Sequence, residues 1–572
     1  MDVPSRRRRP ARLPDGGDAI LAVLAVVVVG FSVLPMARLL LEGIAPGGTP
    51  DPGHALAVLS RTSTWRATWH SLETAVLGTA ISLVLGATFA LLVALTDVRG
   101  KRALVFCFLI PLMIPPQVTA LAWIQLFGPS SAVLGALGLA PPIGTPNPLY
   151  GRDGIVLLLG IQHAPLVFLA LRAGLRAMPR EMVEAARASG ARMPRVLLTV
   201  VLPLMTPALV AGGALAFVSA IGNFGIPAFL GIPAGYATLP TLVYQRLASF
   251  GPGMISDVAV LSVLVGALAM AGFLVQGLVS GGRDYRTIGA PGRALSFRLG
   301  RLRPVAEGGA WLVIALVLAA PLAALVATSL VPAYGVRLSA DTATLANYAE
   351  VALRQDATAR AFANSFLLAG GAALVLLALS AVLAYAIAWR PGPLSRALAV
   401  LVELPYALPG VVLAIAMILV FLRPLPLLDV SLYNTIWIIF VAYLARFLTL
   451  SLRPVVASYL QIDRSLEEAA RMTGARFFHR LRTVLLPLVA PSAAAGAILV
   501  FMTAFNELTV SALLWSVGNE TVGVVVFNLE ESGATVLAAA VAVLTVVAIV
   551  AIMAATAAAE RHLPRGVLPW SD

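Results

Sequence analysis

The sequence is poor in charge, in cysteine and in lysine. Asp, Glu, Lys and Arg make up 12% of its 572 residues, whereas about a quarter of a soluble domain is charged. Its one cysteine, Cys107, excludes a disulfide framework and a cysteine metal site, and we interpret it as a small buried apolar residue. Its one lysine, Lys101, does not follow the G-x-x-x-x-G pattern of a P-loop, so no ATP site of that kind is expected in this chain.

The rest of the chain is strongly apolar. Hydrophobic residues make up 59% of it, and its mean hydropathy is +0.92. They gather into runs of roughly 18 to 25, the length that crosses a hydrocarbon core of ~30 Å as a helix. Inside lipid a helix satisfies its own backbone hydrogen bonds, so we predict an all-α polytopic membrane protein with about twelve transmembrane helices. The expected spans are Ala19–Leu41, Thr74–Leu95, Ala103–Phe127, Gly154–Leu171, Val200–Ile221, Asp257–Val279, Ala310–Val331, Phe362–Trp389, Ala397–Leu422, Asn434–Leu450, Val484–Phe505 and Ala534–Ala558.

The basic residues lie mainly in alternate loops. If the N-terminus is cytoplasmic, the inner loops and tails carry 30 of the 40 Lys and Arg, as the positive-inside rule requires. The net charge of +13 is then explained by membrane topology, and no nucleic-acid partner is needed. The run RRRRPAR before the first apolar segment could belong to a secretory signal. Because no convincing small-residue cleavage site follows, we expect a retained first span.

The two halves of the chain repeat one another. The landmarks Pro111 and Pro115 recur 294 residues later as Pro405 and Pro409. Six spans per half bring both copies into the membrane from the same side, which predicts two parallel six-helix repeats. Four further landmarks recur with an offset of 284: Glu184, Gly190, Pro203 and Pro207 match Glu468, Gly474, Pro487 and Pro491. The expected organisation is a cytoplasmic basic tail (1–18), a first repeat (19–280), a cytoplasmic linker (281–309), a second repeat (310–559) and a cytoplasmic tail (560–572).

The offset of 284 marks a short charged helix in each half, VEAARASG and EEAARMTG. Each helix is too short to span, and Gly190 and Gly474 are expected to end it in a left-handed conformation. Pro179 suits the first helical position of one copy, and Ser465 with Glu468 forms a capping-box pattern in the other. A narrow face of mainly small residues could admit a partner, or each segment could be a solvated loop helix. The same 13-residue interval from glycine to proline in both copies favours docking.

The pattern E-A-A-x-x-x-G, followed by that proline, resembles the signature of ABC importer permeases. The stretches IPPQVTALAWIQLFG, GIVLLLGIQHAPLVFLALRAGLR, GNFGIPAFLGIP and NYAEVALRQDATARAFANSFLLA are similar to the fused permeases of iron(III), phosphonate, thiamine and polyamine importers. The resemblance implies docking to two copies of a cytoplasmic ATPase, which hold ATP and Mg, and delivery of substrate by an extracytoplasmic binding protein. It implies no cofactor on this chain, and a multi-pass location in the inner (cytoplasmic) membrane of a bacterium. The implied docking residues are Glu184, Ala185, Ala186 and Gly190 for one copy, and Glu468, Ala469, Ala470 and Gly474 for the other.

The two copies differ after the glycine, where Phe477 and Phe478 replace Met193 and Pro194. We expect the aromatic pair to strengthen the second contact, since aromatic side chains are enriched at binding hot spots. Prolines at the junction of docked helix and span are candidate hinges, because proline removes a helix hydrogen bond, although simple tolerance explains them equally well. The candidate hinges are Pro203, Pro207, Pro487 and Pro491.

Few polar groups fall within the spans. We interpret Glu403 and Arg446 as an ion pair that holds the bundle, with a substrate role as the alternative, and His163 as a satisfied packing residue. Scarce His and carboxylate side chains predict neither a metal cage nor a catalytic pair, so we expect no enzyme. Candidates for the translocation path or its gate are Asn223, Asn506, Glu507 and Glu403.

The resemblance favours iron(III) as the substrate, with aminoethylphosphonate, thiamine and polyamine as alternatives. A membrane enzyme or a proton-coupled secondary transporter is the alternative of another class. The latter usually needs acidic residues buried within its spans, and Glu403 is the one clear example here.

Overall fold

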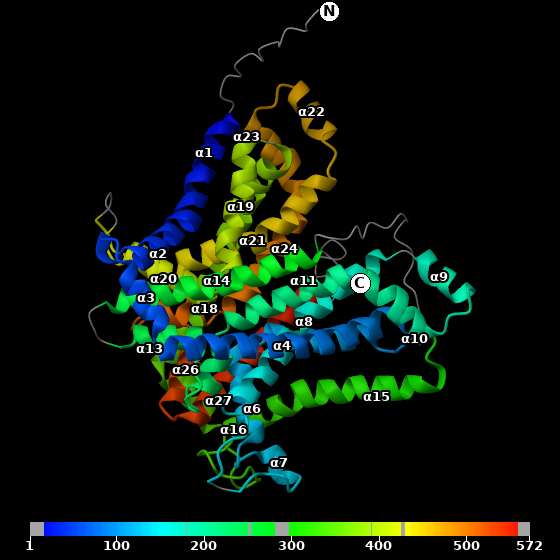
Figure 1. Cartoon of the computed structure of the whole chain (residues 1–572), viewed down its shortest axis with the longest axis vertical. Helices are drawn as coiled ribbons and strands as arrows, with labels where there is room; N and C mark the ends of the chain where they lie inside the picture. The colour runs from blue at the N-terminus through cyan, green and yellow to red at the C-terminus, as the bar shows by residue number, and fades with distance from the viewer. Residues whose placement is uncertain are drawn as a thin grey trace, which may run out of the picture.

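The computed structural model describes residues 16–142, 144–178, 180–249, 253–280, 297–390, 392–424 and 429–558 (Figure 1). Within these ranges the chain is helical, and the one β-bridge joins Thr96 to Phe297. Eleven helices there are long and apolar enough to cross a membrane, and one bent pair makes a twelfth candidate. The prediction of an all-α polytopic membrane protein is confirmed. Pro179, residues 1–15 of the predicted N-terminal tail, the predicted C-terminal tail and most of the predicted linker lie outside the described residues.

Each repeat is built on a bundle of three long helices that pack against one another. Two helices begin earlier than the spans that the sequence predicts at Thr74–Leu95 and Phe362–Trp389. The polar residues in front of each span continue the same series of α-helical backbone hydrogen bonds. The bundle of the first repeat comprises α4 (Thr62–Leu95), α8 (Arg152–Ala177) and α11 (Leu202–Ile221), with α14 (Met254–Ser280) beside it. The bundle of the second comprises α18 (Asp356–Trp389), α21 (Ile436–Gln461) and α24 (Leu486–Phe505), followed by α27 (Thr535–Ala558).

Glycines allow equivalent helices to pack closely in both repeats. A Cβ added at Gly212 of α11 would lie 3.0 Å from the Cα of Val167 in α8. At the equivalent Gly496 of α24, it would lie 2.8 Å from the carbonyl oxygen of Ser451 in α21. Within lipid the hydrophobic effect does not drive helices together. Small residues favour helix association there because they let the backbones pack closely.

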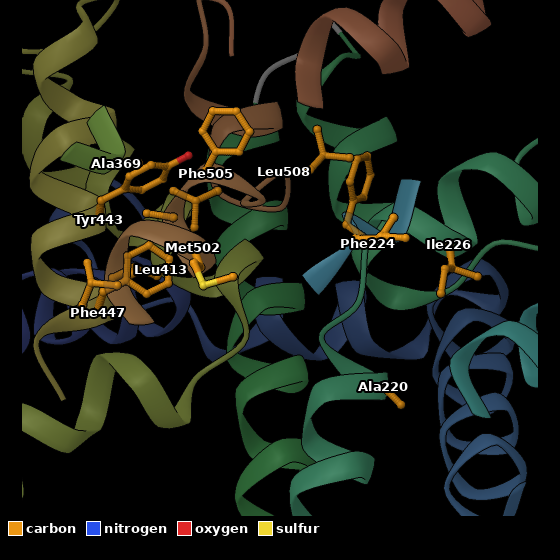
Figure 2. Close-up of a cluster of buried hydrophobic side chains, with 14 of the residues drawn as sticks. Ala220, Phe224, Ile226, Ala369, Leu413, Tyr443, Phe447, Met502, Phe505 and Leu508 are labelled. Atoms are coloured by element: carbon orange, nitrogen blue, oxygen red, sulfur yellow. The ribbon is translucent and has the colours of Figure 1, made fainter. Parts of the chain in front are cut away.

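The first helices of the two repeats are exchanged. The N-terminal helices α1 (Gly16–Val28) and α2 (Leu34–Ile44) pack against α19 (Pro393–Ala407) and α20 (Gly410–Phe421) of the second repeat, and α2 also packs against α14 of its own repeat. Correspondingly, α16 (Ala320–Ser329), which follows α15 (Arg303–Ile314), packs against α6 (Pro116–Phe127) of the first repeat as well as against α27. Each repeat therefore completes the packing of the other. Buried apolar side chains of both repeats belong to one cluster, part of which is drawn in Figure 2.

Two of the predicted spans are broken. Ala103–Phe127 is divided into α5 (Lys101–Met113) and α6, and Ala397–Leu422 into α19 and α20, which are bent by 107°. The residue before a proline is pushed out of the α region, and Ile114 and Leu408 accordingly have ψ of 134° and 145°. The expectation of two continuous spans is therefore wrong, and the repeated prolines mark the breaks.

Candidate coupling site and translocation path

The two short charged helices, here called the EAA helices, are α9 (Arg180–Ala188) and α22 (Ser465–Met472). They lie apart from one another, at the right and at the top of Figure 1. Both end as predicted, with φ of +81° at Gly190 and +82° at Gly474. The N–H of the residue after each glycine donates to a carbonyl five residues back, at 3.2 Å and 3.3 Å, which is the Schellman arrangement.

The predicted capping box of the second EAA helix is not formed. Ser465 makes no capping contact with its side chain; instead its N–H donates to the Asp463 carboxylate at 2.9 Å. This bond lowers the pKa of Asp463 below its usual range. An Asx-type contact starts the helix in place of the serine cap because Asp463 stands two residues earlier, within reach of that N–H.

Most of the predicted docking residues point away from the chain. Glu184, Ala185, Glu468 and Ala469 are exposed, while Ala186 and Ala470 are half-buried. The small-residue face of each helix is thus open on one side. We conclude that both helices have surface available for a partner.

The two EAA helices rest on different kinds of support, here called their seats. In the first, Val183 and Val196 are both fully buried. The equivalent positions in the second, 284 residues later, are Glu467 and Arg480, whose nitrogen and oxygen atoms lie 3.4 Å apart. Their side chains are 12% and 5% exposed. An apolar pair in one repeat therefore corresponds to a buried ion pair in the other.

Further polar and aromatic contacts complete the second seat. Tyr385 of α18 donates its hydroxyl to Glu467 at 2.8 Å, and Arg480 donates to the carbonyl of Ala475 at 2.7 Å. Phe477 packs against Tyr385 with ring centroids 5.4 Å apart and is 5% exposed, whereas Phe478 is 66% exposed. The prediction that both aromatic residues strengthen an external contact is wrong for Phe477, because the seat of the helix buries it.

The first seat includes the end of the segment that joins the repeats. Phe297 exchanges backbone hydrogen bonds with Leu95 and Asp97 at the end of α4, at 2.7 and 3.1 Å. The guanidinium of Arg187 lies 5.5 Å from the centre of the Phe297 ring, a cation–π distance. The N–H of Leu299 donates to Asp97 and lowers the pKa of that carboxyl. The chain between the repeats is therefore tied to the first EAA helix.

A π-helical turn follows each EAA helix at the same place. Leu197–Val201 and Leu481–Leu485 are π-helical, and each is followed by a leucine and then by Pro203 or Pro487. Proline has no N–H and cannot donate the i→i−4 hydrogen bond of an α-helix. In the wider π-helical turn, backbone N–H groups donate instead to the carbonyl five residues back. The candidate hinges thus differ from one another, since Pro207 and Pro491 lie within regular helix.

The predicted ion pair between Glu403 and Arg446 is wrong. Glu403 lies 3.1 Å from Arg453, in a pair that is more than half exposed, and Arg446 lies 3.6 Å from Glu507. Arg453 is two helical turns beyond Arg446 on α21, and the break after α19 places Glu403 beside it. His163 is buried as expected, and its Nδ1 has no hydrogen-bond partner among the described residues.

Three of the four candidate path residues, Asn223, Asn506 and Glu507, lie just after α11 and α24, at the ends of these helices away from the EAA helices. The face of the molecule on that side is here called the outer face. Glu403 lies elsewhere, on α19 beside Arg453. Asn223 and Glu507 are equivalent, and each accepts an N–H from the residue three positions on, at 3.0 and 2.9 Å. These bonds start α12 (Gly225–Gly231) and the turn leading to α25 (Ser511–Leu514). Asn506 donates to the carbonyl of Met113 in the other repeat. The structure therefore gives all three a role in connecting elements.

An aromatic cluster, which the sequence did not reveal, joins the repeats at the outer face. Phe527 of α26 (Val522–Glu531) lies 5.8, 5.7 and 5.7 Å from the ring centres of Phe224, Phe229 and Tyr244. One aromatic residue of the second repeat is thus inserted among three of the first. The signal available was the pair of aromatics in the glycine- and proline-rich stretch GNFGIPAFLGIP.

Comparison with known proteins identifies the family. The model of the binding-protein-dependent transport system inner membrane component matches residues 82–281 and 375–567, more than half of the chain. The chain belongs to this family. These permeases work with an ATPase and a substrate-binding protein, and the many spanning helices agree with a multi-pass inner-membrane protein.

Three relatives show how far the similarity of this permease extends. It is 30% identical over 518 residues to the "Probable ABC transporter permease protein y4fN" of Sinorhizobium fredii, covering 89% of this chain and 90% of that protein. The ferric transport system permease protein FbpB of Actinobacillus pleuropneumoniae is 25% identical over 522 residues, covering 88% and 72%. The molybdenum transport system permease protein ModB of Escherichia coli K12 is 32% identical over 216 residues, covering 37% and 91%.

Proposed function

We propose that this permease forms the membrane pathway of an ATP-driven importer of iron(III). Two copies of a separate cytoplasmic ATPase, which hold ATP and Mg, dock on the EAA helices, and an extracytoplasmic binding protein delivers the substrate. The observation that carries the coupling role is the pair of exposed helices with the same left-handed glycine end, at φ of +81° and +82°. Movement of the docked ATPase copies would reach the spans through the π-helical turns that follow.

Iron(III) is favoured over the other substrates by the extent of the similarity. The ferric permease matches both repeats of this chain, over 522 residues, whereas the molybdenum permease matches 216 residues. Aminoethylphosphonate, thiamine and polyamine are the competing substrates. Uptake of iron(III) by proteoliposomes that contain the permease, its ATPase and its binding protein tests this choice directly. Uptake of a competitor in its place would overturn the choice of iron and leave the importer role standing.

The coupling role is tested by ATP hydrolysis in the same proteoliposomes. Replacing both Glu184 and Glu468 by Ala should abolish the stimulation of ATPase activity by the binding protein. Glu350 is an outer-face carboxylate in the π-helical turn Glu350–Arg354, which follows α17 (Ala346–Ala349). Replacing it by Ala is the control and should leave stimulation unchanged. Substrate uptake without any ATPase subunit would instead favour a proton-coupled secondary transporter.

The orientation is tested by labelling from one side. In a Cys107→Ala background, Ser189→Cys should react with a membrane-impermeant thiol reagent only after the inner membrane is permeabilised. Asp341→Cys, in the exposed loop between α16 and α17, should react without that step. The opposite result would overturn the proposed cytoplasmic N-terminus and the coupling role together.

A further inference from the structure

Residues 297–302, here called the strap, belong to the predicted linker and lead directly into α15 of the second repeat. Yet the strap is bonded to the first repeat, at the end of α4, and its first side chain touches the first EAA helix. The span that begins with α15 is the first of the second repeat. The strap therefore connects the coupling helix of one repeat with a membrane span of the other.

The strap is held to the first repeat at both of its ends. At its start, the two backbone bonds of Phe297 form the β-bridge to the end of α4, and the ring is 8% exposed. At its end, Arg303 of α15 lies 3.8 Å from Asp97 and 2.8 Å from Glu307. The N–H of Arg99 also donates to Glu307 at 2.8 Å. The strap, the start of α15 and the turn after α4 are thus bonded into one unit.

Equivalent arginines of the two EAA helices have different partners. Arg471 of the second helix lies 3.5 Å from Glu467, one helical turn earlier. In the first helix the residue one turn before Arg187 is Val183, which offers no charge. Arg187 lies instead over the ring of Phe297, within cation–π distance. The strap therefore supplies a partner that the first EAA helix does not contain.

The aromatic ring beside each EAA helix comes from a different part of the chain. In the second seat Phe477 packs against Tyr385, and the guanidinium of Arg390 lies 5.9 Å from its ring centre. The position equivalent to Phe477 in the first repeat, 284 residues earlier, is Met193. The ring beside the first EAA helix is that of Phe297. The first repeat thus takes from the linker what the second encodes in its own seat.

We propose that the strap positions the first EAA helix and passes its displacement to α15, with Phe297 as the positioning residue. The inference rests on the proposed function, because this helix is where one ATPase copy would dock. A displacement of α9 moves the strap through Arg187 and Phe297, and α15 follows because Arg303 ties it to the same unit. The continuation of α15, α16, packs against α6 of the first repeat and α27 of the second. One ATPase copy would thereby act on helices of both repeats.

The positioning role is tested without the ATPase, by amide exchange of α9 in the full-length permease in nanodiscs. Phe297→Leu keeps an apolar side chain but removes the ring, and should make exchange about tenfold faster because the cation–π contact is lost. Phe297→Tyr keeps the ring and should behave like the wild type. Arg187→Met should match Phe297→Leu, and the equivalent change in the second helix, Arg471→Met, is the matched control that should leave α9 unchanged. Wild-type exchange in both Phe297→Leu and Arg187→Met would overturn the positioning role.

The transmission role is tested with spin labels in the complex with the ATPase, in a Cys107→Ala background. Labels at Ser189→Cys and Val305→Cys, both exposed, report the distance from α9 to α15. This distance should stay constant when ATP is added, and should change in the presence of Phe297→Leu. A change with Phe297 in place would overturn transmission through the strap.

A second pair of labels separates this inference from the proposed function. Ser189→Cys and Thr473→Cys occupy equivalent positions at the ends of the two EAA helices, and both residues are exposed. The distance between them should change when ATP is added, because each helix would move with its own ATPase copy. A constant distance would overturn the coupling role, whereas the exchange measurement, made without ATPase, decides the positioning role by itself.

Discussion

The two EAA helices have the same backbone conformation, but one rests on an apolar seat and the other on a charged one. Each ends at a glycine of positive φ and continues through a π-helical turn to a proline. Beneath one lie Val183 and Val196, and beneath the other lie Glu467 and Arg480. The conformation of each EAA helix is thus set by the glycine at its end and the π-helical turn that follows. The side chains of the seat beneath it differ completely between the two repeats.

The difference between the seats has a physical meaning. Apolar burial holds a helix without fixing its direction closely, whereas an ion pair with an added tyrosine hydroxyl bond is directional. A buried ion pair contributes little net stability relative to an apolar pair, but its loss on one side is costly. The second EAA helix should therefore respond much more sharply to the loss of a single partner.

The largest effect is expected from putting the charge of the second seat into the first. Val183→Glu places a carboxylate opposite Val196, which cannot pair with it, and should destabilise the first seat by roughly 3–5 kcal/mol. Hydrogen exchange of the α9 amides should become fast, and ATPase stimulation should fall. Adding Val196→Arg should restore part of the protection. Normal protection in Val183→Glu alone would contradict the apolar seat.

The next effect comes from removing half of the ion pair. Arg480→Ala leaves Glu467 with Tyr385 and Arg471 and removes the bond to the Ala475 carbonyl, which should cost about 3 kcal/mol. The double variant Glu467→Val/Arg480→Val copies the first seat and should lie within about 1 kcal/mol of the wild type. Thermal unfolding in nanodiscs and exchange of the α22 amides measure both. A double variant worse than the single one would mean that the seats are not interchangeable.

A smaller effect should be the same in both copies. Gly190→Ala and Gly474→Ala each force a side chain into the left-handed region and should each cost about 1–2 kcal/mol. No heavy atom lies within 4 Å of a Cβ added at either glycine, so the cost is one of conformation alone. Amide exchange of α9 and α22 in the two variants checks this. Unequal losses would show that the seat also shapes the glycine end.

The smallest effect on stability is expected at the exposed aromatic residue. Phe478→Ala should change the stability of the second EAA helix by less than about 0.5 kcal/mol, because the ring is 66% exposed. It should nevertheless weaken ATPase binding roughly tenfold if Phe478 contributes to the docking surface. The matched variant Phe477→Ala should instead lower stability by about 3 kcal/mol through lost packing. Unchanged ATPase affinity in Phe478→Ala would remove it from the docking surface.

The sequence predicted what depends on local chemistry and repetition. Apolar length predicted the helical membrane fold, and Gly190 and Gly474 predicted where the EAA helices end. It failed where the outcome depends on the neighbour across the fold: Glu403 pairs with Arg453 because a broken span places them together. The aromatic cluster around Phe527 needs both repeats in position, so no single segment of the sequence predicts it.

The π-helical turns carry one more residue than a regular α ladder would hold, and this has a mechanical consequence. In an α-helix one residue corresponds to about 100° of rotation and 1.5 Å of rise. Loss of that extra residue at Leu197–Val201 would rotate the first EAA helix by more than a quarter turn relative to the membrane portion of the span. The turn at Leu481–Leu485 carries the same extra residue, so the same rotation is available to the second EAA helix. A displacement of either EAA helix would then rotate the membrane span that follows it.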